Sequence, residues 1–152
     1  MNYQQQAIAG MNPVELIVAL YDGMARFLWH AIAATEAHDA RARRIAIGRV
    51  FDILMHLQSR LRMDIGGTSS RALSEFYASI FALCLEGSRL ESPERLKEAV
   101  SCIRDVREAW NSAAHDPEVL RLLASRQTNQ GVAPSVAAAA QTQEPVSSSW
   151  TA

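Results

Sequence analysis

The fold of this chain is decided by residues 12–37, which read NPVELIVALYDGMARFLWHAIAATEA. Asn12 and Pro13 form a helix start, because an Asn side chain caps free backbone N–H groups and Pro already has the helical φ. Glu15 stands where its carboxylate reaches back to Asn12 in a capping box. The stretch predicts one long amphipathic helix, because apolar side chains recur at the helical period, at Leu16, Leu20, Met24, Phe27 and Ala31.

Three more helical segments follow, separated by short connections. The second helix is expected to follow Asp39 and to end near Gly66-Gly67, with Thr68 to Ser70 offering the next cap. The third ends at a break at Glu91-Ser92, and the fourth begins at the Pro that follows this break. Since no segment shows the alternation of a strand, the sequence predicts an all-α antiparallel four-helix bundle.

The last part of the chain has a different composition. Pro117 follows the cap residue Asp116 and predicts a short extra helix. The 26 residues after Arg126 contain one charged residue, Glu144, and are expected to form a disordered C-terminal tail. The expected organisation is therefore a mobile N-terminal segment (1–11), a helical bundle (12–126) and a tail (127–152).

The composition favours a protein that meets its partners through apolar surface. Hydrophobic residues make up 49% of the chain and charged residues 20%, and the formal net charge is -1. Such a chain has no long-range field for nucleic acid or anionic lipid, so neither is expected as a partner. The short basic run Arg41, Arg43 and Arg44 is interpreted as a solvated helix face, because a nucleic-acid site needs more basic residues with aromatic residues between them.

The sequence also favours the cytoplasm. Residues 1–10 lack the basic and apolar regions of a secretory signal. Charged residues such as Asp22 and Arg26 interrupt the apolar stretches, which argues against membrane insertion. Cys84 and Cys102 lie in apolar periodic segments and are expected to be small core thiols in a reducing compartment.

Residue spacing gives little support to catalysis. His56 is the best candidate, because it lies about 180° from the apolar stripe of its predicted helix, as a histidine phosphotransfer bundle requires. That function stays an alternative, although the Lys and Gly that usually follow such a histidine are missing. No Glu has a His three residues later, as a di-iron bundle needs, and no Cys-x-x-Cys pair suggests zinc. We expect no catalytic residue, no metal and no cofactor.

Two of the predicted helices carry more apolar surface than one buried face requires. At about 100° per residue, the apolar residues of the first helix cover an arc of roughly 160°, against about 120° on the fourth. The third helix is similar, and its two apolar flanks are formed by Phe81 with Leu85 and by Phe76 with Leu83. Either these helices lie centrally and touch neighbours on both sides, or the surplus forms an apolar groove for a partner helix.

A series of short motifs runs along the chain. Tyr3-Gln4-Gln5 is followed by Asn12-Pro13-Val14-Glu15-Leu16-Ile17 and by Leu20-Tyr21-Asp22-Gly23; later come Leu57 to Leu61 with Asp64 and Gly66-Gly67, then Phe76-Tyr77, and finally Val106-Arg107-Glu108-Ala109-Trp110. In this order the motifs resemble the FliS family of flagellin export chaperones over about residues 3–114. Asn12 stands where the family usually has Ser or Thr, Phe76 stands where Leu is common, and residues 116–152 lie outside the pattern.

The resemblance implies an antiparallel helical bundle that binds the C-terminal segment of flagellin in the cytoplasm. Such a chaperone prevents premature polymerisation and presents flagellin to the flagellar type III export apparatus, whose gate components are further candidate partners. A chaperone for a different export client needs the same bundle and stays an alternative. Because exposed grooves favour self-association, the empty chain is expected to be a monomer or a weak homodimer.

The resemblance also implies a set of partner-binding residues. Tyr3, Ile8 and Met11 match the N-terminal stretch that family members lay over a hydrophobic pocket or offer to the client. The signature on the first helix is matched by Leu16, Leu20 and Tyr21. Our hypothesis is that Tyr3 and Ile8 cover a groove beside this helix until flagellin docks. For Leu16 and Leu20, and for Trp110 on the fourth helix, core packing is the alternative explanation.

Overall fold

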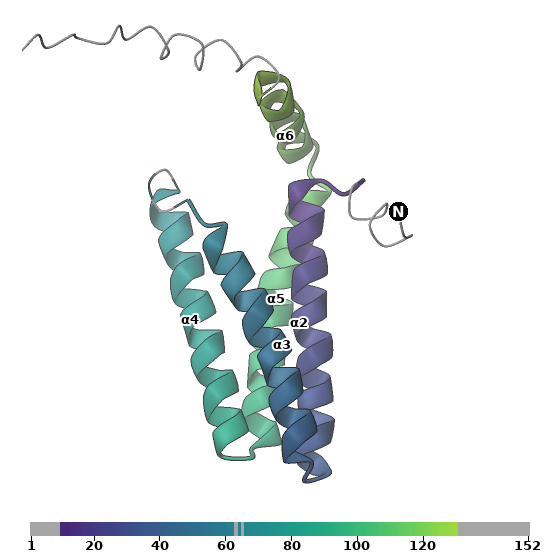
Figure 1. Cartoon of the computed structure of the whole chain (residues 1–152). Helices are drawn as coiled ribbons and strands as arrows, with labels where there is room; N and C mark the ends of the chain where they lie inside the picture. The colour runs from purple at the N-terminus through teal and green to yellow at the C-terminus, as the bar shows by residue number, and fades with distance from the viewer. Residues whose placement is uncertain (1–9, 63, 65, 131–152) are drawn as a thin grey trace, which may run out of the picture. The chain divides into compact units, whose positions relative to one another are not determined.

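The computed structural model describes residues 10–62, 64 and 66–130, without the side chains of 126–130. It divides into two units after Ala114, and each is described by itself. Successive helices of the first unit run in opposite directions through short connections (Figure 1). No described residue lies in a strand, so the predicted all-α antiparallel four-helix bundle is confirmed. Its helices are α2 (Pro13–Glu36), α3 (Ala40–Ser59), α4 (Gly67–Arg89) and α5 (Pro93–Ala114).

The four helices of the bundle form a ring in which each helix packs against two others. Helix α2 contacts α3 and α5, and α4 contacts the same two helices, so α2 and α4 lie on a diagonal. The packing is most extensive between α2 and its two neighbours, and least extensive between α3 and α4. The side of the bundle between α3 and α4 is therefore its most weakly closed side.

The predicted helix starts are confirmed by their caps. The Oδ1 atom of Asn12 accepts a hydrogen bond from the Glu15 N–H at 2.8 Å, and Glu15 Oε2 accepts one from the Asn12 N–H at 3.2 Å. Asp39 caps α3 by accepting from the Ala42 N–H at 3.0 Å. These local bonds satisfy donors that have no partner within the helix, so the sequence signal and the observed boundary agree.

The connection between α3 and α4 differs from the expectation. Helix α3 ends at Ser59 and not near Gly66-Gly67, because Arg60 and Leu61 close it with tighter hydrogen bonds to carbonyls three residues back. The predicted cap at Thr68 to Ser70 was also wrong. The Ser70 hydroxyl instead donates to the Arg62 carbonyl at 3.1 Å, and α4 begins at Gly67, whose φ of +53° suits a glycine.

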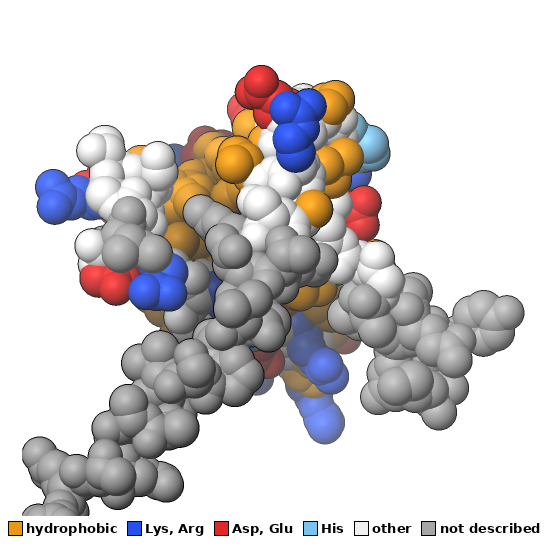
Figure 2. Space-filling view, turned by 90° about the horizontal axis from the view of Figure 1, so that it is seen from above, with side chains coloured by type: hydrophobic (Ala, Val, Ile, Leu, Met, Phe, Trp, Pro, Cys, Tyr) orange, Lys and Arg blue, Asp and Glu red, His pale blue; other side chains and the backbone are white. Residues whose placement is uncertain are grey.

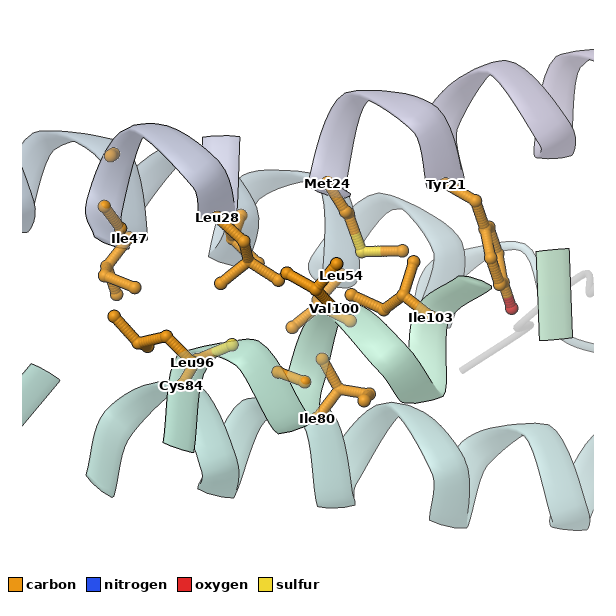
Figure 3. Packing of buried hydrophobic residues seen from close by; sticks show 14 of the residues in the cluster. Tyr21, Met24, Leu28, Ile47, Leu54, Ile80, Cys84, Leu96, Val100 and Ile103 are labelled. Atoms are coloured by element: carbon orange, nitrogen blue, oxygen red, sulfur yellow. The ribbon is translucent and has the colours of Figure 1, made fainter. Parts of the chain in front are cut away.

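The core lies between the four helices (Figure 3). Tyr21, Met24 and Leu28 are fully buried on α2 and follow the predicted helical period. The other helices contribute further side chains to the same cluster, among them Val50, Leu54, Ile80, Cys84, Leu96, Val100 and Ile103. Because α2 has core contacts toward two neighbours, most of its surplus apolar arc is used for packing, which is the first of the two explanations given for it.

The basic run on α3 is not wholly a solvated face. Arg41 and Arg44 are exposed, but Arg43 is 7% exposed, which corrects the expectation for this residue. Its guanidinium donates to Glu91 Oε1 at 2.9 Å and to the Ser88 hydroxyl at 3.3 Å. A cation can be buried here because partners at the end of α4 and just beyond it meet its charge and its donors.

The two cysteines have different environments. Cys84 is fully buried, as expected, and burial raises the pKa of its thiol to about 12. Cys102 is exposed, so its expected place in the core was wrong. It lies on the outer face of α5, two positions after the buried Val100, and a helix turns about 200° over that interval.

Helix α2 is long and apolar. By length and composition it alone, among the helices that the structure describes, is long and apolar enough to cross a membrane, so its interrupting charges do not exclude a span as the sequence argument assumed. The core helix of a soluble bundle meets the same criterion. Its fully buried side chains are used in the bundle core, and this packing is the better argument against a span.

The second unit contains α6 (Pro117–Gln130), the extra helix predicted after Asp116. Asp116 Oδ1 accepts a hydrogen bond from the Glu118 N–H at 2.8 Å and so caps its start. Residues 127–130 continue this helix, whereas the sequence argument assigned them to the tail. The expected N-terminal segment up to residue 9 and the tail from residue 131 lie outside the described residues, and the domain division stays a prediction.

Candidate functional site

The feature that distinguishes the surface of the bundle is an apolar groove between α3 and α4. Its floor is formed by Phe51 on α3 and Phe81 on α4, whose ring centroids lie 4.4 Å apart with planes tilted by 34°. Large apolar side chains remain exposed along it: Met55 is 73% exposed, Leu85 50% and Phe81 43%. An apolar surface of this kind, left open between two helices, is the usual mark of an interaction site.

Two hollows meet at the Phe51–Phe81 pair and together form what we call the α3–α4 groove. The first, which we call the apolar lobe, has a volume of about 250 Å³ and no charged side chain. It is lined by Leu54, Met55, Gln58, Ser74, Tyr77, Ala78 and Phe81. The second, the arginine lobe, has a volume of about 400 Å³ and no acidic side chain. It is lined by Arg43, Arg44, Ile47, Gly48, Phe51, Leu85, Ser88 and Arg89.

The chemistry of the groove suits an amphipathic helix. Apolar side chains from the two helices form a trough that an apolar stripe of a third helix fills by the helix-in-groove mode. The exposed Met55 adds an unbranched, polarizable side chain that adapts to clients of different shape. The groove has no constellation for bond-making chemistry, and among the described residues no group of His, Cys, Asp and Glu could hold a metal ion.

A second pocket, larger than either lobe of the groove, lies between α2 and α5 and has a different character. Its volume is about 650 Å³, and its lining includes Asp22, Trp29, Arg104 and Arg107. Arg107 Nε lies 2.9 Å from Asp22 Oδ1, and the Arg104 guanidinium lies 5.7 Å from the Trp29 ring centroid. Because charged side chains from both helices line this pocket and its exposed aromatic ring is partly covered by a cation, it is a poorer receptor for an apolar stripe than the α3–α4 groove.

Side chains of both charges are visible in the view of Figure 2. Basic and acidic side chains there lie among hydrophobic surface, without a continuous field of one sign. This distribution agrees with the net charge of -1 and with recognition through apolar contact.

The Leu-Tyr-Asp-Gly motif on α2 has a structural explanation. Tyr21 is fully buried, and its hydroxyl donates to the Tyr77 hydroxyl at 2.9 Å. Burial raises the pKa of Tyr21, while the Tyr77 hydroxyl and the nearby Trp110 indole lower it without reversing the effect. The Trp110 N–H is itself buried and forms no hydrogen bond of ordinary geometry with the described residues.

The next two positions of the motif also hold helices together. Asp22 pairs with Arg107, so a motif on α2 meets the Val-Arg-Glu-Ala-Trp motif on α5. A Cβ added at Gly23 would lie 3.3 Å from Ile53 Cδ1, so the absence of a side chain lets α3 approach α2 closely. Much of the motif pattern is therefore explained by packing.

The structure separates the residues expected to bind a partner. Tyr3 and Ile8 lie outside the described residues, and their role stays a prediction. Met11 and Leu16 are half-buried at the start of α2, and Leu20 packs against the core. Tyr21 is buried. Trp110 packs against the core, which agrees with the alternative explanation given for it. None of the described members of this set, Met11, Leu16, Leu20, Tyr21 and Trp110, lines the α3–α4 groove.

Part of the groove was predicted from the sequence, and the rest was not. Phe81 and Leu85 were singled out as a surplus apolar flank, and both are exposed groove residues. Met55 and Arg89 were missed. One signal for Met55 was available, since it follows Phe51 by four residues and so shares a helix face with it. His56 is exposed, as expected.

The comparisons with known proteins decide the family. A family model described as "Flagellar protein FliS" matches residues 1–117. The chain belongs to the FliS family. It is 23% identical over 104 residues to the flagellar secretion chaperone FliS of Vibrio cholerae, covering 68% of this chain and 76% of that one. It is 26% identical over 117 residues to FliS of Campylobacter jejuni, covering 77% and 91%.

A third relative extends the same result. The flagellar secretion chaperone FliSB of Pseudomonas aeruginosa is 26% identical over 117 residues, covering 74% of this chain and 93% of the relative. FliS is a family of flagellar chaperones and not of enzymes, which confirms the expected absence of catalysis. The matched region ends at Pro117, the first residue of α6, so the rest of α6 lies outside the family pattern.

Proposed function

We propose that this chain is a cytoplasmic export chaperone that binds the C-terminal segment of flagellin. It prevents premature polymerisation and presents flagellin to the flagellar type III export apparatus. The observation that carries the proposal is the α3–α4 groove, an exposed apolar trough on a bundle that belongs to the FliS family.

The physical requirement of such a client fits this surface. A segment that forms coiled-coil contacts in a filament has an apolar stripe, and before export that stripe needs a temporary cover. A chaperone must also release the client. In the empty groove the side chains are already partly buried, so covering them buries only their remaining exposed area, which limits the affinity and allows release. Covering Met55, Phe81 and Leu85 transfers their remaining exposed apolar area from water and supplies the driving force.

The direct test is complex formation with full-length flagellin. Monomeric flagellin and the purified full chain are mixed and separated by size exclusion, and polymerisation is followed by light scattering after seeding. We expect a stoichiometric complex and a suppressed scattering signal. Flagellin truncated before its C-terminal segment is the control and should neither co-elute nor be affected. Unchanged polymerisation of full-length flagellin, with the bundle shown to be folded by circular dichroism, would contradict the proposal.

Two N-terminal residues belong to the same proposal. We expect the double variant Tyr3→Ala, Ile8→Ala to bind flagellin more weakly with an unchanged melting curve, because both residues precede the cap at Asn12. A lowered melting temperature with unaltered binding would instead assign these residues to the fold.

A further inference from the structure

The α3–α4 groove is electrically asymmetric. The apolar lobe contains no charged side chain, whereas the arginine lobe contains three Arg side chains. The charge of Arg43 is met by Glu91 at 2.9 Å. Arg44 and Arg89 are exposed, and neither forms an ion pair with any residue in the described part of the chain. Two cations are therefore left open at one end of an apolar trough.

The groove also has a defined length and direction. From Arg44 to Gln58, its lining residues on α3 span about 20 Å at 1.5 Å per residue, so it accommodates a helix of roughly 14 residues. On α4 the same interval runs from Arg89 back to Ser74. The arginine lobe therefore lies at the beginning of α3 and at the end of α4.

We propose that Arg44 and Arg89 orient the client helix, with its carboxyl end in the arginine lobe and its apolar stripe over Met55 and Phe81. This inference rests on the proposed function, because the occupant is a helix of the C-terminal segment of flagellin. The carboxyl end of a helix has unsatisfied carbonyl groups and a partial negative charge, and carboxylates close to that end add to it. The bound helix then runs parallel to α4 and antiparallel to α3.

The burial of Arg43 strengthens the asymmetry. Its ion pair with Glu91 and its hydrogen bond to Ser88 hold the guanidinium at the wall of the lobe. Because Glu91 already balances its charge, Arg43 contributes N–H donors to the lobe and does not require a carboxylate from the client. Arg44 and Arg89 are free to move toward a bound carboxylate or to free carbonyl oxygens, which Arg meets through several N–H donors. An amino end placed there would bring the positive end of a helix against two cations.

Photo-crosslinking tests the orientation directly. The C-terminal segment of flagellin is synthesised with a benzoylphenylalanine either at the amino end or at the carboxyl end of its predicted helix, bound to the full chain and irradiated. The label at the carboxyl end should be recovered by mass spectrometry on residues 41–48 and 85–92, and the label at the amino end on residues 54–62 and 74–81. The reverse pattern, or equal labelling of both ends, would overturn the inference.

A matched pair of variants tests the two arginines. Arg44→Ala with Arg89→Ala removes the open cations, and Arg49→Ala with Arg71→Ala removes the same charge from exposed positions of the same helices that do not line the groove. We expect the first pair to weaken binding by roughly tenfold, as two partly exposed charge contacts allow, and to flatten its dependence on salt. The second pair should bind as the wild type does.

The outcomes separate this inference from the proposed function. Absence of binding by the folded wild-type chain would contradict the proposed function itself. Tight binding that both variant pairs alter equally, or that neither alters, would leave flagellin as the client and would refute the role of Arg44 and Arg89.

Discussion

The ring centroids of Phe51 on α3 and Phe81 on α4 lie 4.4 Å apart. This pair closes the bundle on the side where its helices pack least extensively. Phe81 is 43% exposed although it contacts Phe51. Part of its ring therefore packs within the bundle, and part remains in contact with solvent. A client helix that covers this pair would bury the part of the Phe81 ring that the bundle leaves exposed. Fold and binding therefore share these two residues.

Replacing Phe81 by Ala should weaken binding while the bundle remains folded. Because the side chain is only partly buried, we expect a loss of roughly 1–2 kcal/mol in the free energy of unfolding, below the cost at a fully buried Phe. Affinity for the flagellin segment should fall by about tenfold or more, as for an aromatic residue at the centre of an interface.

The matched control for this prediction is Ile45→Ala. Ile45 is 55% exposed on the same bundle, but it lines the pocket between α2 and α3. Calorimetric titration measures affinity and urea unfolding measures stability. Equal losses of affinity in the two variants would show that the client does not single out the α3–α4 groove.

The fold was largely predictable because its decisive signals are local. Asn12, Asp39 and Asp116 cap helices through residues two or three positions away, and such bonds are written in the sequence. The prediction of the connection after α3 was wrong because the contact that decides it is not local. Ser70 bonds to the Arg62 carbonyl, eight residues away and across the connection, and no rule based on neighbouring residues predicts that contact.

The site was less predictable than the fold. The surplus flank of Phe81 and Leu85 was visible from helical spacing, but its partner surface on α3 depends on how two helices pack. The same limit applies to Arg43, which spacing alone assigned to solvent and which the packing of α3 and α4 buries against Ser88 and Glu91. Helical spacing says which residues share a face, and only tertiary packing says what covers that face.

The hydrogen bond between the buried Tyr21 and Tyr77 should appear as an energetic coupling. Tyr77→Phe leaves the Tyr21 hydroxyl buried without its acceptor, and Tyr21→Phe has the converse effect, so each should lower the free energy of unfolding by about 1–3 kcal/mol. The double variant should cost less than the sum, because both hydroxyls are then absent. Urea unfolding of the four proteins gives the cycle, and strictly additive costs would contradict a direct bond.

The same two hydroxyls and the Cys84 thiol predict how stability depends on alkaline pH. Burial raises the pKa of Tyr77, as it does that of Tyr21, and raises the pKa of Cys84 to about 12. The folded chain therefore holds these protons more tightly than the unfolded chain, whose thiol and phenols ionise from about pH 9 to pH 10. The contribution of these groups to stability is complete below that range and is lost progressively as the pH rises from it toward the higher pKa values of the folded chain.

We therefore expect the urea midpoint to fall from about pH 9 upward. The variant Tyr21→Phe, Tyr77→Phe, Cys84→Ala should begin from a lower midpoint and fall less over the same range. The single variant Cys102→Ala is the control, because this thiol is exposed. An equally steep fall in the triple variant would assign the alkaline sensitivity to other groups.

The most direct test of the account is calorimetric titration of the full chain with a peptide spanning the C-terminal segment of flagellin from the same organism, repeated at several temperatures. A peptide from the central part of flagellin is the control. The account predicts stoichiometric binding of the C-terminal peptide with a negative heat-capacity change, the mark of apolar surface buried on binding. No heat of binding at any temperature, from a chain that circular dichroism shows to be folded, would contradict it and would point to a different export client.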